Sequence, residues 1–221
     1  MTVSLFACNN DKGQAKPNGE LPSQLKNERY YFQQGYRTDW KINVADPSGY
    51  LVDTETNLVL QLVPAEGREV DEEGKVINEG TAIAGVEYTI YAYKSNEHQG
   101  DAQKINMTST PSEVISWIMD ENNGFYFNSR FYVDSPRDTF MQRPDVTTYT
   151  AKFSKLQFLQ ISYTFTRDGE DWRGIYNFVM KGQDFFIVTF EAKADLYEQY
   201  EAQYNETIGD FRKVGWETSN V

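Results

Sequence analysis

Residues 185–211 read FFIVTFEAKADLYEQYEAQYNETIGDF, in which a strand pattern is followed by a helix pattern. It begins with an aromatic and β-branched run, Phe185–Phe190, which favours a strand. A helix is predicted to begin near Asp195, with Glu198 three residues later as its capping partner. Apolar residues then recur about every four residues, which predicts one buried stripe on that helix. The stripe comprises Leu196, Tyr200, Tyr204, Ile208 and Phe211.

Two further strands are predicted immediately before this stretch. Leu156–Thr166 alternates between apolar and polar residues, and Trp172–Met180 does the same. The turn residues Asp168–Asp171 connect these two strands, and Lys181–Asp184 lead into the strand that begins at Phe185. The three strands should form an antiparallel meander, and the helix should lie across one of its faces. Leu159, Ile161, Tyr163 and Phe165 are expected on one face of the first strand.

The remaining chain is predicted to be mixed. Further strands are expected at Glu28–Phe32, Leu58–Val63, Val86–Tyr93, Phe125–Val133 and Thr147–Phe153. Pro64 should end the second of these. The acidic segment Glu66–Gly80 is interpreted as a solvated loop or a hairpin that turns at Asp71–Gly74. A second helix is expected from Thr110 to about Gly124, because a capping threonine precedes a proline at the first helical position.

The end of the chain resembles a known family. A hydrophobic strand, an alanine-containing link, an amphipathic helix and a closing Ile208-Gly209-Asp210-Phe211 follow one another, and this order is similar to the C-terminal signature of PsbP-like proteins. The resemblance extends over residues 156–213 and, more loosely, over 86–133. It implies an α+β fold in which an antiparallel β-sheet is flanked by helices, the PsbP-like α/β/α sandwich. Photosynthetic members of that family assist oxygen evolution, and many bacterial relatives are lipoproteins.

The single cysteine has a distinctive setting. Leu5-Phe6-Ala7-Cys8 resembles the lipobox of bacterial lipoproteins, in which a diacylglyceryl group is attached to the cysteine thiol. The short apolar stretch before Cys8 is interpreted as the remnant of a signal peptide. Asn9–Asn27 is polar and holds two prolines, which is typical of a disordered tether. Fully extended, such a tether would reach about 60 Å at ~3.3 Å per residue.

These patterns predict a two-part organisation. Residues 1–27 should comprise the signal-peptide remnant, the lipobox and the tether, and residues 28–221 should form a single PsbP-like domain. The expected location is the outer face of the bacterial cytoplasmic membrane, held by a lipid on Cys8. An ordinary frayed terminus with a free thiol is the alternative, and it would suit a secreted or a cytosolic protein.

Composition excludes several classes of function. The net charge of −12 disfavours nucleic acid as a partner, because a binder needs clustered Lys and Arg to displace counterions. One cysteine and one histidine, His98, remove most metal and triad chemistry, so no cofactor or metal site is expected. The acidic runs at residues 71–73 and 168–171 lack EF-hand spacing, so solvated turns are favoured over calcium sites.

The sequence therefore favours a non-catalytic module. The expected function is binding or assembly on the cell envelope, with an unknown protein or carbohydrate as ligand. Aromatic residues could supply the contacts. They cluster at Tyr30, Tyr31, Phe32, Tyr36 and Trp40 and again at 125–132. Burial of these rings in the core is the simpler interpretation. The alternative function is an envelope hydrolase that acts through paired carboxylates, and it would require two converging acids in a pocket.

Overall fold

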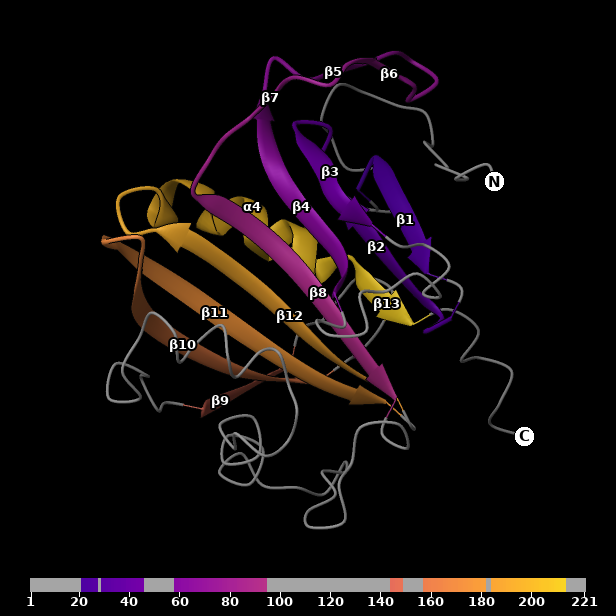
Figure 1. Ribbon diagram of the computed structural model, residues 1–221. Helices are drawn as coiled ribbons and strands as arrows, with labels where there is room; N and C mark the ends of the chain where they lie inside the picture. Colours follow the sequence, from indigo (N-terminus) through magenta and orange to yellow (C-terminus); the bar gives the residue numbers. More distant parts are fainter. Residues whose placement is uncertain are drawn as a thin grey trace, which may run out of the picture.

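The computed structural model describes residues 21–27, 29–45, 58–94, 144–148, 157–181 and 184–213 (Figure 1). Its main sheet has the strand order β3-β4-β8-β12-β11-β10-β9, with β7 paired to one end of β4. The strands are β3 (Trp40–Ala45), β4 (Leu58–Glu66), β7 (Thr81–Ala82), β8 (Val86–Lys94), β9 (Pro144–Thr148), β10 (Gln157–Arg167), β11 (Glu170–Lys181) and β12 (Asp184–Lys193). All of these neighbours pair antiparallel.

Two smaller sheets complete the strands of the described chain. One has the order β1-β2-β13, and the other is the hairpin β5-β6. Their strands are β1 (Ser23–Asn27), β2 (Phe32–Tyr36), β13 (Phe211–Lys213), β5 (Glu69–Val70) and β6 (Val76–Asn78). The hairpin confirms the prediction for Glu66–Gly80. Its turn is closed by Asp71, whose carboxylate Oδ1 accepts the backbone N–H groups of Glu73 and Lys75.

The meander β10-β11-β12 confirms the strongest prediction from sequence. Leu159 pairs with Phe178 and Phe165 with Trp172 across the first hairpin. Its two turn residues, Asp168 and Gly169, have φ angles of 54° and 77°. Positive φ at both central residues matches the twist of the flanking strands, which is why an Asp-Gly pair suits this turn.

The helix α4 (Tyr197–Gly209) begins two residues later than the predicted start at Asp195. Its N-cap is Leu196, and no side chain caps it, so the predicted capping role of Glu198 is wrong. The link after β12 instead forms a turn in which the Leu196 N–H donates to the Lys193 carbonyl at 2.9 Å. The helix buries Tyr197, Tyr200, Tyr204, Thr207 and Ile208, and Phe211 lies beyond it in β13.

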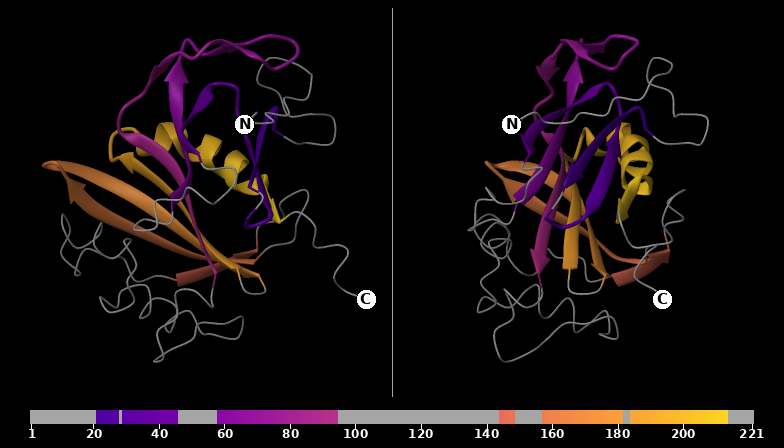
Figure 2. Two further views of the ribbon diagram at one scale, coloured as in Figure 1. Left: turned by 45° about the vertical axis from the view of Figure 1, so that its right-hand side comes forward. Right: turned by 90° about the vertical axis from the view of Figure 1, so that its right-hand side faces the viewer.

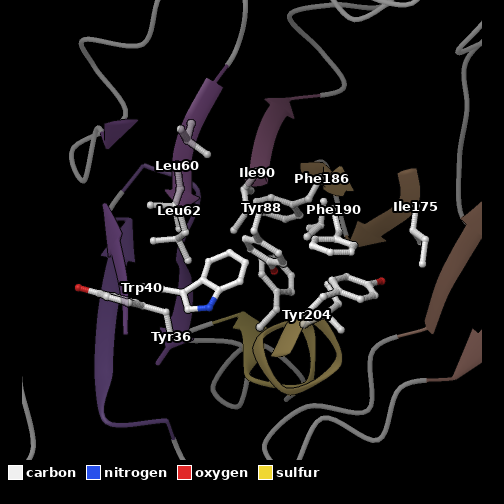
Figure 3. Close-up of a cluster of buried hydrophobic side chains, with 14 of the residues drawn as sticks. Tyr36, Trp40, Leu60, Leu62, Tyr88, Ile90, Ile175, Phe186, Phe190 and Tyr204 are labelled. Atoms are coloured by element: carbon white, nitrogen blue, oxygen red, sulfur yellow. The ribbon is translucent and has the colours of Figure 1, made fainter. Parts of the chain in front are cut away.

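Helix α4 and the three-stranded sheet β1-β2-β13, called the small sheet below, lie on the same face of the main sheet (Figure 2). Between these layers lies an aromatic core, drawn in Figure 3. Tyr204 stacks on Phe190 with ring centroids 4.9 Å apart and an interplanar angle of 12°. Trp40 meets Tyr200 edge to face at 6.3 Å. Burying aromatic rings of this size supplies much of the apolar area that drives folding.

The architecture is therefore an antiparallel β-sheet with a helix on one face. The predicted antiparallel sheet is confirmed, and α4 is the flanking helix in the described part of the chain. The second helix predicted from Thr110 and the strand predicted at 125–133 lie outside the described residues. So does most of the strand predicted at 147–153, of which β9 holds the start. In the described part of the chain, no helix has the length and apolarity needed to cross a membrane.

The N-terminal strands differ from prediction. Residues 29–31 form a turn rather than a strand, because the Asn27 side chain accepts the Tyr30 N–H at 2.9 Å and Tyr31 adopts a φ of 49°. Strand β1 lies in residues that were expected to belong to the tether. It is part of the folded domain, because it pairs with β2 and Leu25 is buried. The polar composition of this segment conceals the backbone pairing.

Pro64 does not end β4, which continues to Glu66. Proline lacks only the N–H, and it is tolerated in a sheet where that donor is not needed. Its carbonyl accepts the N–H of Ile83 at 2.8 Å, and the next residue, Ala65, donates to the Asp39 carbonyl at 2.8 Å. Hydrogen bonds of the Pro64 carbonyl and of the Ala65 N–H therefore hold β4 in place beyond the proline.

Two buried polar groups tie the helix to the strands beneath it. The Gln34 amide donates to the carbonyls of Gly35 and Thr207 at 2.7 and 2.6 Å, while its oxygen accepts from the Tyr88 hydroxyl at 2.7 Å. The Asn177 amide donates to the Tyr204 hydroxyl at 2.7 Å. Buried polar groups satisfied in this way specify how the layers fit together.

Replacing Tyr204 with phenylalanine should lower the free energy of unfolding by about 1–2 kcal/mol, because the buried Asn177 amide loses an acceptor while ring stacking is kept. Urea denaturation measures the change. Tyr31→Phe is the matched control, since Tyr31 is 61% exposed and should shift stability by less than about 0.5 kcal/mol. Equal effects of the two substitutions would contradict a role for the hydroxyl.

Burial raises the pKa of the Tyr36 phenol above its ordinary value of 10.0, and the charge of Arg68 and a hydrogen bond with Ser23 only partly offset this. The unfolded chain therefore releases the phenolic proton at a lower pH than the folded chain does. Stability contributed by Tyr36 is present below about pH 10 and falls as the pH rises further. In urea titrations between about pH 9 and pH 11, Tyr36→Phe should lose stability less steeply than the wild type. Parallel curves would show that Tyr36 does not contribute.

Candidate functional site

The residues singled out in the sequence divide into two groups. Cys8, His98 and the aromatic run at 125–132 lie outside the described residues. Of the early aromatic residues, Tyr30, Phe32, Tyr36 and Trp40 are buried in the core, and Tyr31 is exposed. These rings are therefore core residues, with the exception of Tyr31.

The acidic runs also have structural roles. Asp71 closes the β5-β6 turn, and the Asp171 carbonyl accepts the N–H of Ala194 at 2.9 Å. Within the described ranges, no three His, Cys, Asp or Glu side chains are grouped so that they could hold a metal ion. Solvated turns remain the interpretation of both runs.

A charged cluster lies on the face of the main sheet that is turned away from α4, here called the distal face. Tyr88 and Phe190 contact Tyr204 on the helix side, so their strand neighbours Glu87 and Glu191 point to the distal face. These two glutamates are directly opposite each other on β8 and β12. Like charges placed opposite each other on neighbouring strands repel, so the pair requires a counter-charge.

Arg167, the last residue of β10, supplies that charge. Its guanidinium pairs with Glu87 Oε1 at 2.7 Å and also with Glu191 Oε2. The Glu191 side chain is only 3% exposed, and those of Glu87 and Arg167 are 13% and 18% exposed. We call these three residues the Glu–Arg–Glu cluster.

Gly174 explains how Arg167 reaches across the sheet. Strand β11 lies between β10 and β12, and the β11 residue opposite Glu191 is Gly174. Because glycine has no side chain, β11 presents none between Arg167 and Glu191 at that row of the distal face. The guanidinium also lies 4.2 Å from the ring centroid of Trp172 and 5.0 Å from that of Phe165. These cation–π contacts hold it over β11.

Polar side chains extend the cluster toward the edge of the sheet. Gln61 on β4 donates to Glu87 Oε2 at 2.6 Å, and Asn43 on β3 donates to the Gln61 oxygen at 2.6 Å. The resulting chain of hydrogen bonds runs from β3 to β10. Both carboxylate oxygens of Glu87 are therefore engaged, one by a cation and one by an amide.

This arrangement defines what the cluster can do chemically. A general acid or base must exchange a proton with a bound substrate. Here the two acids, Glu87 and Glu191, share one guanidinium within the sheet. The geometry is that of a buried ion pair linking strands, and removal of one partner from such a pair is strongly destabilising.

The sequence interpretation missed this cluster. Glu87 occupies an alternating position in an otherwise apolar strand, and Gly174 interrupts β11, which is a sign of close approach by another group. Both signals are visible in the sequence. The pairing of β8 with β12, which brings Glu87 and Glu191 together, is a long-range contact that local periodicity does not reveal.

The fold is similar to solved structures. The solution structure of cyanobacterial PsbP (CyanoP) from Synechocystis sp. PCC 6803 superposes with a TM-score of 0.52 at 6% identity, covering 86% of this chain and 91% of that one. The chain thus has a PsbP-like fold, in agreement with the resemblance noted in its sequence. No protein-family model and no curated protein matches the sequence.

Two weaker likenesses accompany it. A crystal structure from Bacteroides thetaiotaomicron VPI-5482 gives a TM-score of 0.42 at 11% identity, covering 92% of this chain and 49% of that one. LpqN, involved in cell envelope biogenesis of Mycobacterium tuberculosis, gives 0.45 at 9% identity and 81% of each chain.

Arg167→Met should lower the free energy of unfolding by about 3–5 kcal/mol, because it removes the guanidinium that pairs with both Glu87 and Glu191. Thermal or urea denaturation measures the loss. Adding Glu87→Gln and Glu191→Gln to the same chain should restore part of the stability, since the repulsion is removed.

Arg173→Met is the matched control for this series. Arg173 also stacks on a ring, that of Tyr197, but its ion pair with the 86%-exposed Glu198 is 3.7 Å long. Its replacement should cost less than about 1 kcal/mol. An equal loss in the two arginine variants, or no recovery in the triple variant, would contradict the role given to the cluster.

Proposed function

We propose that this protein is a non-catalytic binding or assembly module with a PsbP-like fold, tethered to the outer face of a bacterial cytoplasmic membrane by a lipid on Cys8. The observation that carries the non-catalytic part is the Glu–Arg–Glu cluster. Its two carboxylates lie directly opposite each other on β8 and β12, and both are paired with Arg167 within the protein.

The proposed anchor rests on sequence. Leu5-Phe6-Ala7 precedes Cys8 in the manner of a lipobox, and the polar residues that follow would separate the domain from the lipid surface. Lipidation favours membrane attachment by about 0.8 kcal/mol for each buried CH₂ group. The ligand of the module is proposed to be a protein or a carbohydrate of the envelope.

Expression of the gene in its native context, followed by mass spectrometry of the purified protein, tests the anchor. We expect the mature chain to begin at a diacylated Cys8 and to partition with membranes. The Cys8→Ala variant should lack the lipid and should leave the membrane fraction. A wild-type chain that keeps residues 1–7 and carries no lipid would overturn the anchor.

The alternative function, a carboxylate-dependent envelope hydrolase, is tested with a panel of ester, glycoside and peptide substrates. The matched proteins are the wild type and the triple variant Arg167→Met with Glu87→Gln and Glu191→Gln, which removes all three charges of the cluster together. We expect no difference in hydrolysis between them, because both acids serve the ion pair. A wild-type rate that falls at least about a hundredfold in a folded triple variant would favour the hydrolase instead.

A further inference from the structure

A buried carboxylate joins the two ends of the described chain. Asp210 Oδ2 accepts the backbone N–H of Leu21 at 2.8 Å, a hydrogen bond between residues 189 positions apart. Asp210 is 4% exposed and Leu21 is 5% exposed. A backbone donor that is buried at the entrance to β1 needs an acceptor, and a charged acceptor makes the stronger hydrogen bond.

Gly35 makes this contact possible. Asp210 precedes β13 on one side of β2, and Gly35 in β2 pairs with Gln24 of β1 on the other side. A Cβ atom at Gly35 would lie 1.8 Å from Asp210 Oδ2 and 2.6 Å from its Cγ. The carboxylate therefore occupies the space of the missing side chain and crosses β2 to reach the N-terminal segment.

The backbone of Asp210 is held as well. Its N–H donates to the Thr207 carbonyl at 3.1 Å at the end of α4, and its carbonyl accepts the Gly35 N–H at 3.4 Å. The carboxylate is thus placed by the helix end and by β2 together. A side chain fixed in this way is preorganised for its acceptor role, so little entropy is lost when Leu21 docks.

We propose that Asp210 and Gly35 form a latch that fixes the point at which the N-terminal segment enters the domain. The latch makes the start of β1 a fixed attachment site, so that a pull on the N-terminal segment acts on α4 and β2 and does not peel β1 from the sheet. Its role in a membrane tether rests on the proposed function. The latch itself is a property of the folded domain.

Hydrogen exchange on the full chain, read by mass spectrometry of peptides, tests the latch. Asp210→Ala removes the acceptor, and Gly35→Ala leaves the carboxylate present but displaces it. Gly35 does not have a positive φ, so alanine introduces no backbone strain at that position. Both variants should speed exchange over residues 21–27 by about tenfold or more and leave β10–β12 unchanged. Asp210→Asn, which retains an oxygen acceptor, should restore most of the protection.

Val179→Ala serves as the control for general destabilisation, because Val179 is buried in the core on β11. It should raise exchange without selecting residues 21–27. The latch is overturned if the Asp210 and Gly35 variants reproduce the exchange pattern of Val179→Ala, or if residues 21–27 remain protected in them. Because the experiment uses unlipidated protein, its result is independent of whether Cys8 carries a lipid.

Discussion

The stacking of Tyr204 on Phe190 is the contact on which the architecture depends. It joins the centre of α4 to the central strand β12, with the rings nearly parallel and fully buried. The Tyr204 hydroxyl also accepts from Asn177, so one side chain sets both the distance and the rotation of the helix over the sheet. The small sheet follows from this placement, because β13 continues directly from the end of α4 and pairs with β2.

The main sheet is buried on both of its faces. On the helix side lie Tyr88, Ile90 and Phe190, and on the distal side Ile187 and Tyr176 are equally inaccessible. A strand buried on both faces, such as Phe186–Phe190 in β12, is apolar nearly throughout. A charged group within it needs an ion-pair or hydrogen-bond partner, and Arg167 is such a partner for both Glu87 and Glu191. The distal face thus combines apolar packing with the Glu–Arg–Glu cluster.

Sequence patterns predicted local structure well and long-range structure poorly. The meander followed from alternation and from the turn at Asp168-Gly169, and the stripe of α4 followed from its spacing of four residues. Strand β1 was missed because its stability comes from β2, Asp210 and the burial of Leu25 rather than from its own composition. The Glu–Arg–Glu cluster was missed because it joins residues from three strands, and only the strand order brings them together.

The position of β2 has a consequence for the order in which the protein folds. One edge of β2 pairs with β1, which precedes it, and the other pairs with β13, which is the last element of the described chain. A chain made or exported from its N-terminus therefore holds an incomplete three-stranded sheet until residue 213 is available. Contacts of such large sequence separation slow folding. The three-stranded sheet is therefore the last part of the described fold that can be completed.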